Sequence, residues 1–218
     1  MGKKTKNFET SSYAKLDELV TRVMCDTASP SGIADAAYLF GETKDNELSV
    51  IAAALLAWKL KRVKKIALCG NSGGHGYPGF ENWKSKLVKL GIPGGKIISL
   101  PLAFDFPPST HAESYGLARY AKKAQWKNIY IIAPPLHQLR AFVTTVTAFK
   151  KEKTPTKIFN FVGLPQQWEE HIIHSQGVQK GTRSELLEKE LKKIERYYKT
   201  GDLISGTEVL KYLNQRDK

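Results

Sequence analysis

The chain has 218 residues, of which 41% are apolar and 25% are charged, and this balance is typical of a globular protein rather than of a disordered chain. Lys and Arg outnumber Asp and Glu by 34 to 21, and the resulting formal net charge of +13 favours negatively charged partners. The longest apolar run, residues 50–58, is far shorter than the roughly 20 residues of a membrane-spanning helix, so no membrane span is expected.

The cysteines and the N-terminal residues indicate a cellular compartment. Cys25 and Cys69 form neither a CxxC pair nor a disulfide framework, which suits a reducing environment. Cys69 falls within an apolar run, where cysteine packs as a small apolar residue. Residues 1–12 contain no apolar core of the kind found in signal peptides. We therefore expect a cytoplasmic protein.

An N-terminal helical extension over residues 1–30 precedes a predicted core over residues 31–165, in which short apolar runs recur about every 30 residues. The runs are AAYLF (36–40), KIALC (65–69), KIISL (96–100), IYIIA (129–133) and KIFNFV (157–162). Each run is continuous rather than alternating, as in strands that are buried on both faces. Because helical patterns separate the runs, we predict an α/β fold, a Rossmann-like three-layer sandwich with a parallel sheet of about five strands.

Two of the connecting helices have a recognisable apolar face. After the first run, the face comprises Leu48, Ile51, Leu55 and Leu56, behind a cap at Asp45 or Asn46. After the second run, it comprises Phe80, Trp83, Leu87 and Leu90, and Gly91 is expected to end the helix. Apolar stripes of this kind pack against the sheet of an α/β protein.

Residues 166–218 are expected to form a C-terminal helical segment that packs on the core. The longer helix, over 183–199, has an apolar stripe that comprises Leu187, Leu191, Ile194 and Tyr198. A shorter helix follows, and either Ser205 or Thr207 forms a capping box with Glu208 at its start.

Polar and glycine residues follow the predicted strands. Gly41 and Glu42 follow the first strand, a glycine-rich loop over 70–79 follows the second, and His137 comes shortly after the fourth. The connections at the opposite edge of the sheet read KRVKK, GIPGGK, QWKN and KEKTPTK, and these are basic and turn-like. Ligands of open parallel sheets bind beyond the carboxyl ends of the strands. The sequence therefore predicts a ligand site at that edge, and Gly41 and Glu42 are candidate ligand-binding residues.

The loop GNSGGHGYPG (70–79) is a second source of ligand contacts. Glycine lets backbone N–H groups approach a ligand closely, and the helix that begins near Pro78 presents an N-terminus suited to an anion. The candidate ligand-binding residues here are Gly70, Asn71, Gly73, Gly74, His75 and Glu81. The loop matches neither a dinucleotide fingerprint nor a Walker loop, so a surface loop without a ligand is the alternative.

The segment STHAE (109–113) lies between the third and fourth strands. Thr110 is a candidate ligand-binding residue, and Glu113 is a candidate catalytic residue for proton transfer. The two also match an S/T-x-x-E capping box, which would account for both without any ligand. In that alternative, His111 is an exposed residue of the first helical turn.

His137 and Arg140 follow the fourth strand at i, i+3 spacing, which places them on one face in the first turn of a helix. The helix dipole and a guanidinium fork favour a carboxylate or phosphate there. Histidine adds a group that transfers protons near neutrality, so His137 is a candidate catalytic residue and Arg140 a candidate ligand-binding residue. The alternative is structural: Arg140 pairs with Glu113 or Glu81, and His137 only begins the helix.

The histidines do not predict a metal site. His75, His111, His137, His171 and His174 lack the spacing of zinc ligands, so no metal is expected. His171 and His174 follow QQWEE and are expected on a solvent-facing helix. No GxSxG motif marks a serine nucleophile.

These motifs, in this order, resemble the YdcF/SanA/ElyC family of bacterial proteins with a domain of unknown function. The matching segments are LFG (39–41), AAALLAWK (52–59), KKIALCGNSGG (64–74), Glu81, LGIPGGKI (90–97), STHAES (109–114) and IIAPPLHQLRAF (131–142). The hallmark of the family is a His-x-x-Arg-Ala signature after a strand, here His137 to Ala141, preceded by a Thr at a helix start, here Thr110. The resemblance covers roughly residues 35–163.

The resemblance implies a Rossmann-like fold with a small-molecule site. For the YdcF-like branch, the implied ligand is S-adenosylmethionine, without an established reaction. SanA-like and ElyC-like members are anchored in the membrane, and this chain lacks their membrane-spanning segment, so it looks more like the soluble YdcF-like branch.

Three functions are compatible with the sequence. The leading hypothesis is a soluble protein that binds an anionic small molecule, a nucleotide or an S-adenosylmethionine-like ligand, at the carboxyl ends of the strands. The second is a hydrolase or transferase that acts on a phosphorylated metabolite, with His137 as general acid or base. The third is a nucleic-acid binder, and it ranks last because the lysines are dispersed over several helices and no recognition motif is present.

Overall fold

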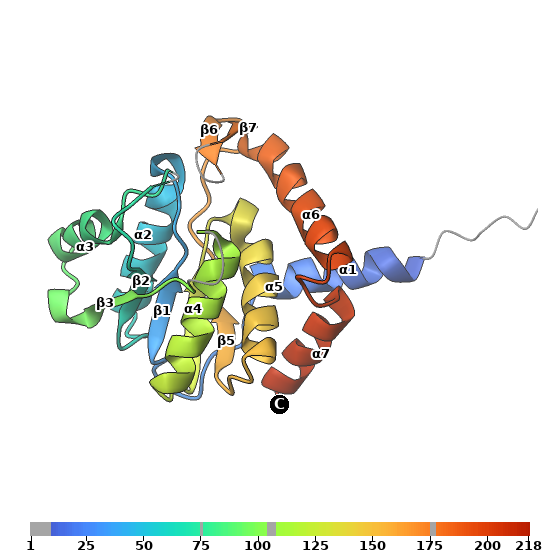
Figure 1. The fold of residues 1–218 in the computed structure, drawn as a ribbon, viewed down its shortest axis with the longest axis horizontal. Helices are drawn as coiled ribbons and strands as arrows, with labels where there is room; N and C mark the ends of the chain where they lie inside the picture. Colours follow the sequence, from blue (N-terminus) through green and yellow to red (C-terminus); the bar gives the residue numbers. More distant parts are fainter. Residues whose placement is uncertain (1–9, 75, 104–107, 175–177) are drawn as a thin grey trace, which may run out of the picture.

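The central sheet of the computed structural model contains five parallel strands in the part of the chain that the structure describes, residues 10–74, 76–103, 108–174 and 178–218 (Figure 1). The strands are β1 (Ala36–Leu39), β2 (Ile66–Cys69), β3 (Ile97–Leu100), β4 (Asn128–Ile132) and β5 (Lys157–Asn160). They lie in the order β3-β2-β1-β4-β5, and each neighbouring pair is parallel. The predicted α/β class and the Rossmann-like sheet are therefore confirmed.

Helices cover both faces of this sheet. The helices of the core are α2 (Lys44–Lys59), α3 (Phe80–Lys89), α4 (Thr110–Lys123) and α5 (Pro135–Lys151), and a 3-10 turn, η1 (Gly94–Lys96), precedes β3. Successive strand residues point to opposite faces. Ala37 and Leu39 of β1 therefore pack in the apolar cluster with α2 and α3, whereas Ala36 and Tyr38 pack in the cluster with α4 and α5.

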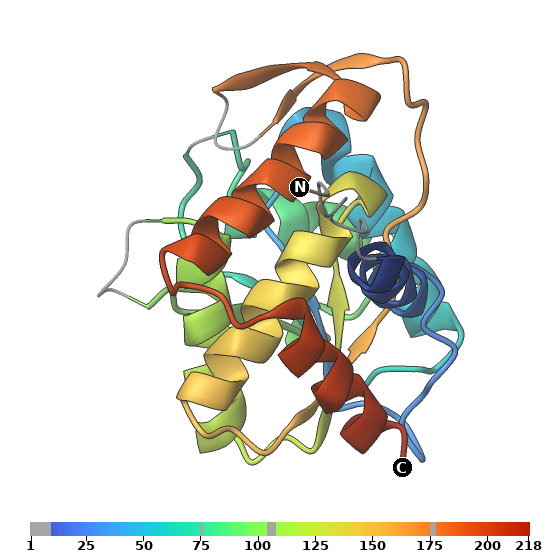
Figure 2. The same ribbon diagram turned by 90° about the vertical axis from the view of Figure 1, so that its right-hand side faces the viewer.

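Three helices from the terminal segments pack on the outer side of α5. The helices concerned are α1 (Thr10–Met24), α6 (Arg183–Lys199) and α7 (Gly206–Arg216). Figure 2 shows α6 and α7 crossing α5, with α1 beside it. A buried ion pair holds this arrangement: Arg216 donates to both carboxylate oxygens of Asp26 over 2.6 Å and 2.8 Å, and Asp26 also accepts from the backbone N–H of Asn160 at 3.0 Å. The two terminal segments are thus fixed to β5.

A small hairpin, β6 (His171–His174) and β7 (Gln179–Thr182), lies over the amino end of α2. The hydroxyl of Thr43 donates to the carbonyl of Ile173 at 2.6 Å, and the N–H of Ile173 donates to Asp45 at 2.6 Å. The expectation of a solvent-facing helix for His171 and His174 is wrong. Burial in β6 alternates, with His171 exposed and His174 buried, but four residues are too few to reveal a period of two in the sequence.

The predicted apolar faces of α2 and α6 are wrong in part. Leu48 and Leu56 are exposed, whereas the residues of α2 that face the sheet are Val50, Ile51, Ala53, Ala54 and Ala57. Small side chains let the helix backbone approach the strands, so in an alanine-rich helix the bulkier residues need not mark the buried face. In α6, Leu191 and Tyr198 are exposed, and the buried residues are Arg183, Leu186 and Glu190.

Helix ends agree better with the sequence. Ser205 and Glu208 form the predicted capping box at the start of α7. Gly91 follows α3 with a φ of 97°, the left-handed conformation that favours glycine after a helix, although Leu90 is exposed. Thr43, rather than Asp45 or Asn46, occupies the N-cap position of α2, and its side chain makes no capping hydrogen bond there.

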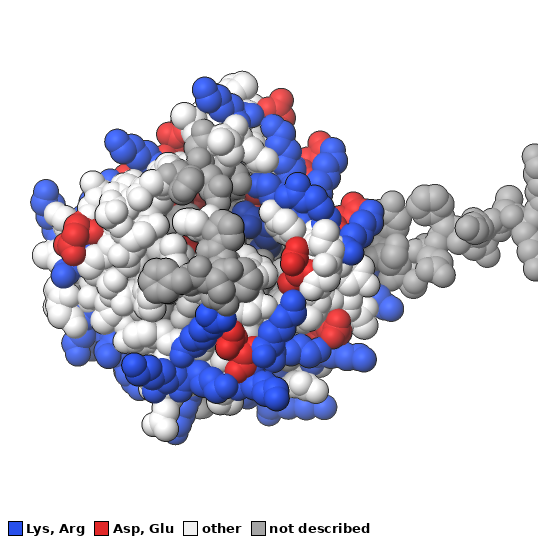
Figure 3. All heavy atoms as spheres, in the orientation of Figure 1, with Lys and Arg blue, Asp and Glu red and all other residues white. Residues whose placement is uncertain are grey.

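Lysines gather at the amino ends of the strands. A hollow there is lined by Lys122, Lys127, Lys153 and Lys157, and Figure 3 shows Lys and Arg along the lower rim of the molecule. This surface lies at the opposite edge of the sheet from the predicted ligand site. In the described part of the chain, none of the helices has the length and apolar composition needed to cross a bilayer.

Candidate functional site

A pocket of about 290 Å³ lies beyond the carboxyl ends of the strands. β1 and β4 are neighbours in the sheet, but the helices that follow them, α2 and α5, lie on opposite faces, so a crevice opens between them. The lining residues from the core are Gly41, Glu42, Thr43, Cys69, Asn71, Gly74, Tyr77, Leu102, Pro108, Ser109, Thr110, Glu113, His137 and Arg140. Those from the C-terminal segment are His174, Val178, Gln179, Lys193, Arg196 and Tyr197.

The pocket brings together most of the predicted site residues. These are Gly41, Glu42, Asn71, Gly74, Thr110, Glu113, His137 and Arg140. Gly70, Gly73 and Glu81 do not line it. A side chain at Gly70 would collide with the Ser99 hydroxyl, at 2.1 Å, so this glycine is needed for packing. Glu81 is exposed on α3. His75 lies outside the described residues.

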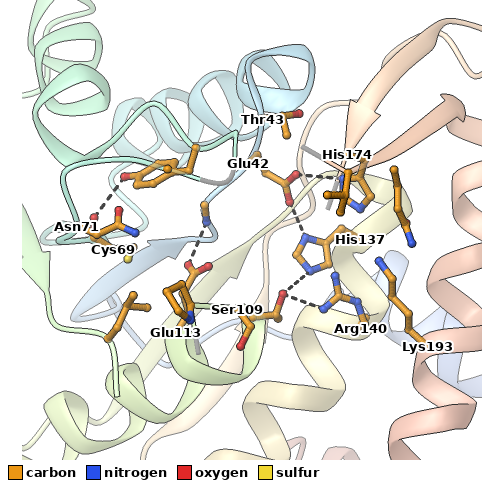
Figure 4. Close-up of a pocket in the computed structure, with 18 of the residues that line it drawn as sticks. Glu42, Thr43, Cys69, Asn71, Ser109, Glu113, His137, Arg140, His174 and Lys193 are labelled. Carbon is orange, nitrogen blue, oxygen red and sulfur yellow. Dashed lines mark hydrogen bonds and ion pairs between the residues drawn. The ribbon is translucent and has the colours of Figure 1, made fainter. Parts of the chain in front are cut away.

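The ring of His137 is held by the carboxylate of Glu42. Two prolines place His137 here: Pro134 occupies the N-cap position of α5 and Pro135 begins the helix, so His137 falls in its first turn. Its Nδ1 lies 2.5 Å from Oε1 of Glu42, and both residues are 3% exposed. A carboxylate only accepts hydrogen bonds, so Nδ1 carries the proton and Nε2 has a free lone pair. Figure 4 shows the Glu42 carboxylate between the rings of His137 and His174.

Thr110 connects His137 with Arg140. The Thr110 hydroxyl oxygen lies 3.2 Å from Nε2 of His137, and Nη1 of Arg140 donates to the same oxygen at 2.8 Å. Since Arg140 donates, the hydroxyl proton of Thr110 is directed to Nε2. A continuous chain of hydrogen bonds thus runs from Glu42 through His137 to Thr110. Arg140 lies in the second turn of α5 rather than the first.

Glu190, which sequence reasoning missed, is the ion-pair partner of Arg140. The Nε of Arg140 donates to Glu190, and Nζ of Lys193 contacts the other oxygen at 2.5 Å. The structural alternative, in which Arg140 pairs with Glu113 or Glu81, is therefore wrong about the partner. Glu190 is 1% exposed. It lies one helical turn after Leu186 on the buried face of α6, a face that the sequence pattern did not reveal, and an acidic residue on a buried face needs a partner.

His174 was also missed, and it bridges two carboxylates. Its Nδ1 lies 3.6 Å from Glu42, and its Nε2 lies 3.4 Å from Glu190. The amide of Asn46 lies 3.3 Å from Nδ1. Burial lowers the pKa of His174, but the contacts with Glu190 and Glu42 outweigh that effect and raise it. His174 therefore holds a proton more readily than an ordinary histidine, and it lies between the two acids.

Burial and neighbouring charges set the protonation states of Glu42 and His137. Burial raises the pKa of the Glu42 carboxyl, but His137 and His174 outweigh burial and hold it at about 2, so the group is ionised. Burial and the charge of Arg140 lower the pKa of His137 despite the carboxylate beside it. His137 is therefore a neutral imidazole at pH 7, the form that accepts a proton.

Glu113 does not form the predicted capping box with Thr110. Ser109 caps α4, and its side chain accepts from the N–H of Ala112 at 3.3 Å. Glu113 instead points inward, where it accepts from the hydroxyl of Tyr38 at 2.8 Å and from the N–H of Gly41 at 3.0 Å. Burial raises the pKa of Glu113 to about 7, and the negative charge of Glu42 adds to this, although the two hydrogen bonds oppose it.

The pocket has the groups for anion binding and for proton transfer. His137 can take a proton, Glu113 can give one near neutrality, and Arg140 presents a fixed positive charge. Among the described residues, no group of three or more His, Cys, Asp and Glu side chains is arranged to hold a metal ion. Comparison of the chain with protein-family models, curated proteins and solved structures gives no match. The resemblance to the YdcF/SanA/ElyC family stays a prediction.

The raised pKa of Glu113 predicts a pH-dependent stability. Between the ordinary pKa of a glutamate and about 7, folded Glu113 keeps a proton that the unfolded chain has lost, so stability falls as pH rises through this window. Gln imitates the protonated acid at every pH. The unfolding free energy of the wild type, relative to Glu113→Gln, should therefore fall by about 1–3 kcal/mol between pH 5 and pH 8.

Urea unfolding at pH 5, 6, 7 and 8 measures this difference. Glu81→Gln, at an exposed position outside the pocket, is the matched control. A difference between wild type and Glu113→Gln that stays constant over the range would contradict the assignment.

Proposed function

We propose that the protein binds an anionic small molecule in this pocket. The observation that best supports this proposal is the concentration of positive charge around the pocket. Arg140, Lys193 and Arg196 line the pocket and His174 carries a raised pKa, whereas Glu42 and Glu190 are the ionised acids that balance them. Arg140 and Lys193 both contact Glu190, which places two cations at one wall of the pocket. These cations attract an anionic group of a ligand and donate hydrogen bonds to it.

The shape and lining of the pocket favour a metabolite with a planar group. Its volume lies at the lower end of the range for small-molecule sites. Tyr77 and Tyr197 contribute aromatic surface, and Leu102 contributes aliphatic surface. A nucleotide or an S-adenosylmethionine-like molecule has both parts, a phosphate or carboxylate for the cations and a base for the apolar wall. The resemblance to the YdcF-like branch supports S-adenosylmethionine as one ligand of this class.

One observation favours a second candidate, a hydrolase or transferase that acts on a phosphorylated metabolite. The ordered chain from Glu42 through His137 to Thr110 orients a neutral imidazole toward a hydroxyl. A site that only binds an anion has no need of an oriented base, whereas general-base catalysis requires one.

Removal of the positive charge at Arg140 tests anion binding. Calorimetric titration with inorganic phosphate, AMP and S-adenosylmethionine should show binding of at least one probe to the wild type. We expect Arg140→Gln to weaken that binding by about tenfold or more, because a charge-assisted hydrogen bond contributes about 1.5–3 kcal/mol. Lys150→Gln, which removes a cation at an exposed site on the same helix, is the control. Equal affinities for the two variants, or no binding of any probe, would count against the proposal.

Replacement of His137 tests the enzymatic candidate. Hydrolysis of p-nitrophenyl phosphate or its diester by the wild type should fall about 100-fold or more in His137→Gln, because the general base is lost. His171→Gln is the control, since His171 is exposed on β6. The lowered pKa of His137 also predicts that the acid limb of the rate profile lies below the usual histidine pKa of about 6.5. Activity that survives in His137→Gln would remove the histidine from the mechanism.

A further inference from the structure

The hydroxyl of Thr110 combines features that neither binding nor helix capping requires. It lines the pocket at the first residue of α4. The capping of that helix is done by Ser109, so the Thr110 oxygen is not used to satisfy the helix N-terminus. It lies instead between Nε2 of His137 at 3.2 Å and Nη1 of Arg140 at 2.8 Å.

The two neighbours of this oxygen act on it in the same direction. The lone pair at Nε2 of His137 is directed at the hydroxyl proton, because Glu42 holds the proton of the ring at Nδ1. Arg140 donates to the oxygen and stabilises negative charge that develops on it. The positive end of the α4 dipole adds to this. A hydroxyl with a base on one side and an anion-stabilising donor on the other is an activated nucleophile.

We propose that Thr110 is a nucleophile that attacks the phosphorus of a phosphoester, with His137 as its base and Glu42 as the group that positions the base. This inference rests on the enzymatic candidate above and deepens it. The arrangement has the roles of a nucleophile, base and orienting acid, supplied by threonine, histidine and glutamate.

The proposed reaction proceeds in two steps. In the first, a bond forms between Oγ1 of Thr110 and phosphorus, the bond to the leaving oxygen breaks, and the threonine proton passes through Nε2 of His137 to the leaving group. In the second, water attacks the phosphothreonine and gives one proton to Nε2, and that proton returns to Oγ1 of Thr110 as phosphate departs. In a transferase, the hydroxyl of an acceptor takes the place of water.

The pocket accounts for the charges in these steps. Glu42 stabilises the imidazolium that forms at His137 in both of them. Arg140 is fixed by its ion pair with Glu190, so its donor stays directed at the oxygen. Lys193 and Arg196 line the same pocket and meet the remaining phosphoryl oxygens.

An alkyl fluorophosphonate tests the nucleophile without knowledge of the substrate. This probe is uncharged and forms a bond with activated hydroxyl groups as fluoride leaves, so its reaction does not depend on anion binding. Intact-mass measurement of the wild-type protein should show one adduct, and tandem mass spectrometry of the digest should place it on Thr110. An adduct on another residue, or no adduct, overturns the proposal.

Variants separate a nucleophile from a residue that only holds its neighbours. Thr110→Val keeps the shape and removes the hydroxyl, and its labelling rate should fall about 100-fold or more, whereas Thr110→Ser should stay within about tenfold of the wild type. Glu42→Gln should slow labelling at least tenfold, because the base loses its orienting carboxylate. His171→Gln should react at the wild-type rate. Circular dichroism and thermal unfolding of each variant confirm that it is folded.

The outcomes also distinguish this proposal from the functions above. Phosphate or AMP binding that depends on Arg140, without an adduct on Thr110, leaves anion binding in place and rejects the nucleophile. Phosphoester hydrolysis that depends on His137 but persists in Thr110→Val makes water the nucleophile and also rejects it.

Discussion

The buried carboxylate of Glu42 is the constraint on which the site depends. It stands at the carboxyl end of β1, it is 3% exposed, and it is ionised. A charge in that position is tolerated only if its neighbours satisfy it. His137 does so from α5, and His174 does so from β6. The Glu42 carboxylate therefore fixes the tautomer of His137 in the core. It also helps to hold the C-terminal hairpin, β6 and β7, over the strand ends.

The C-terminal segment is consequently part of the site. The Rossmann-like core supplies Thr110, His137 and Arg140, but the partner that fixes Arg140 is Glu190 of α6. His174 completes the network, since it lies between Glu42 and Glu190. The charge of the pocket thus depends on both parts of the chain. The cations that line the pocket come from both the core and α6.

The sequence predicted the sheet, the edge at which the pocket lies and much of the core lining of that pocket, because apolar runs and the residues that follow them are local signals. It did not predict His174 or Glu190. A four-residue strand is too short to show its period, and a glutamate in a lysine-rich helix has the pattern of a solvated face. It also misread Glu113, because a capping box and an inward-facing acid have the same spacing, and only tertiary packing decides between them.

The protonation state of His137 tests the hydrogen-bond chain from Glu42 to Thr110 most directly. It is measured by nitrogen NMR of protein with ¹⁵N-labelled histidines, and the His137→Gln variant assigns the resonances. We expect a neutral ring at pH 7.5 with the proton on Nδ1 and none on Nε2, and we expect Glu42→Gln to disturb this tautomer. A ring that carries its proton on Nε2, or one that is doubly protonated at that pH, would contradict the hydrogen-bond chain from Glu42 to Thr110.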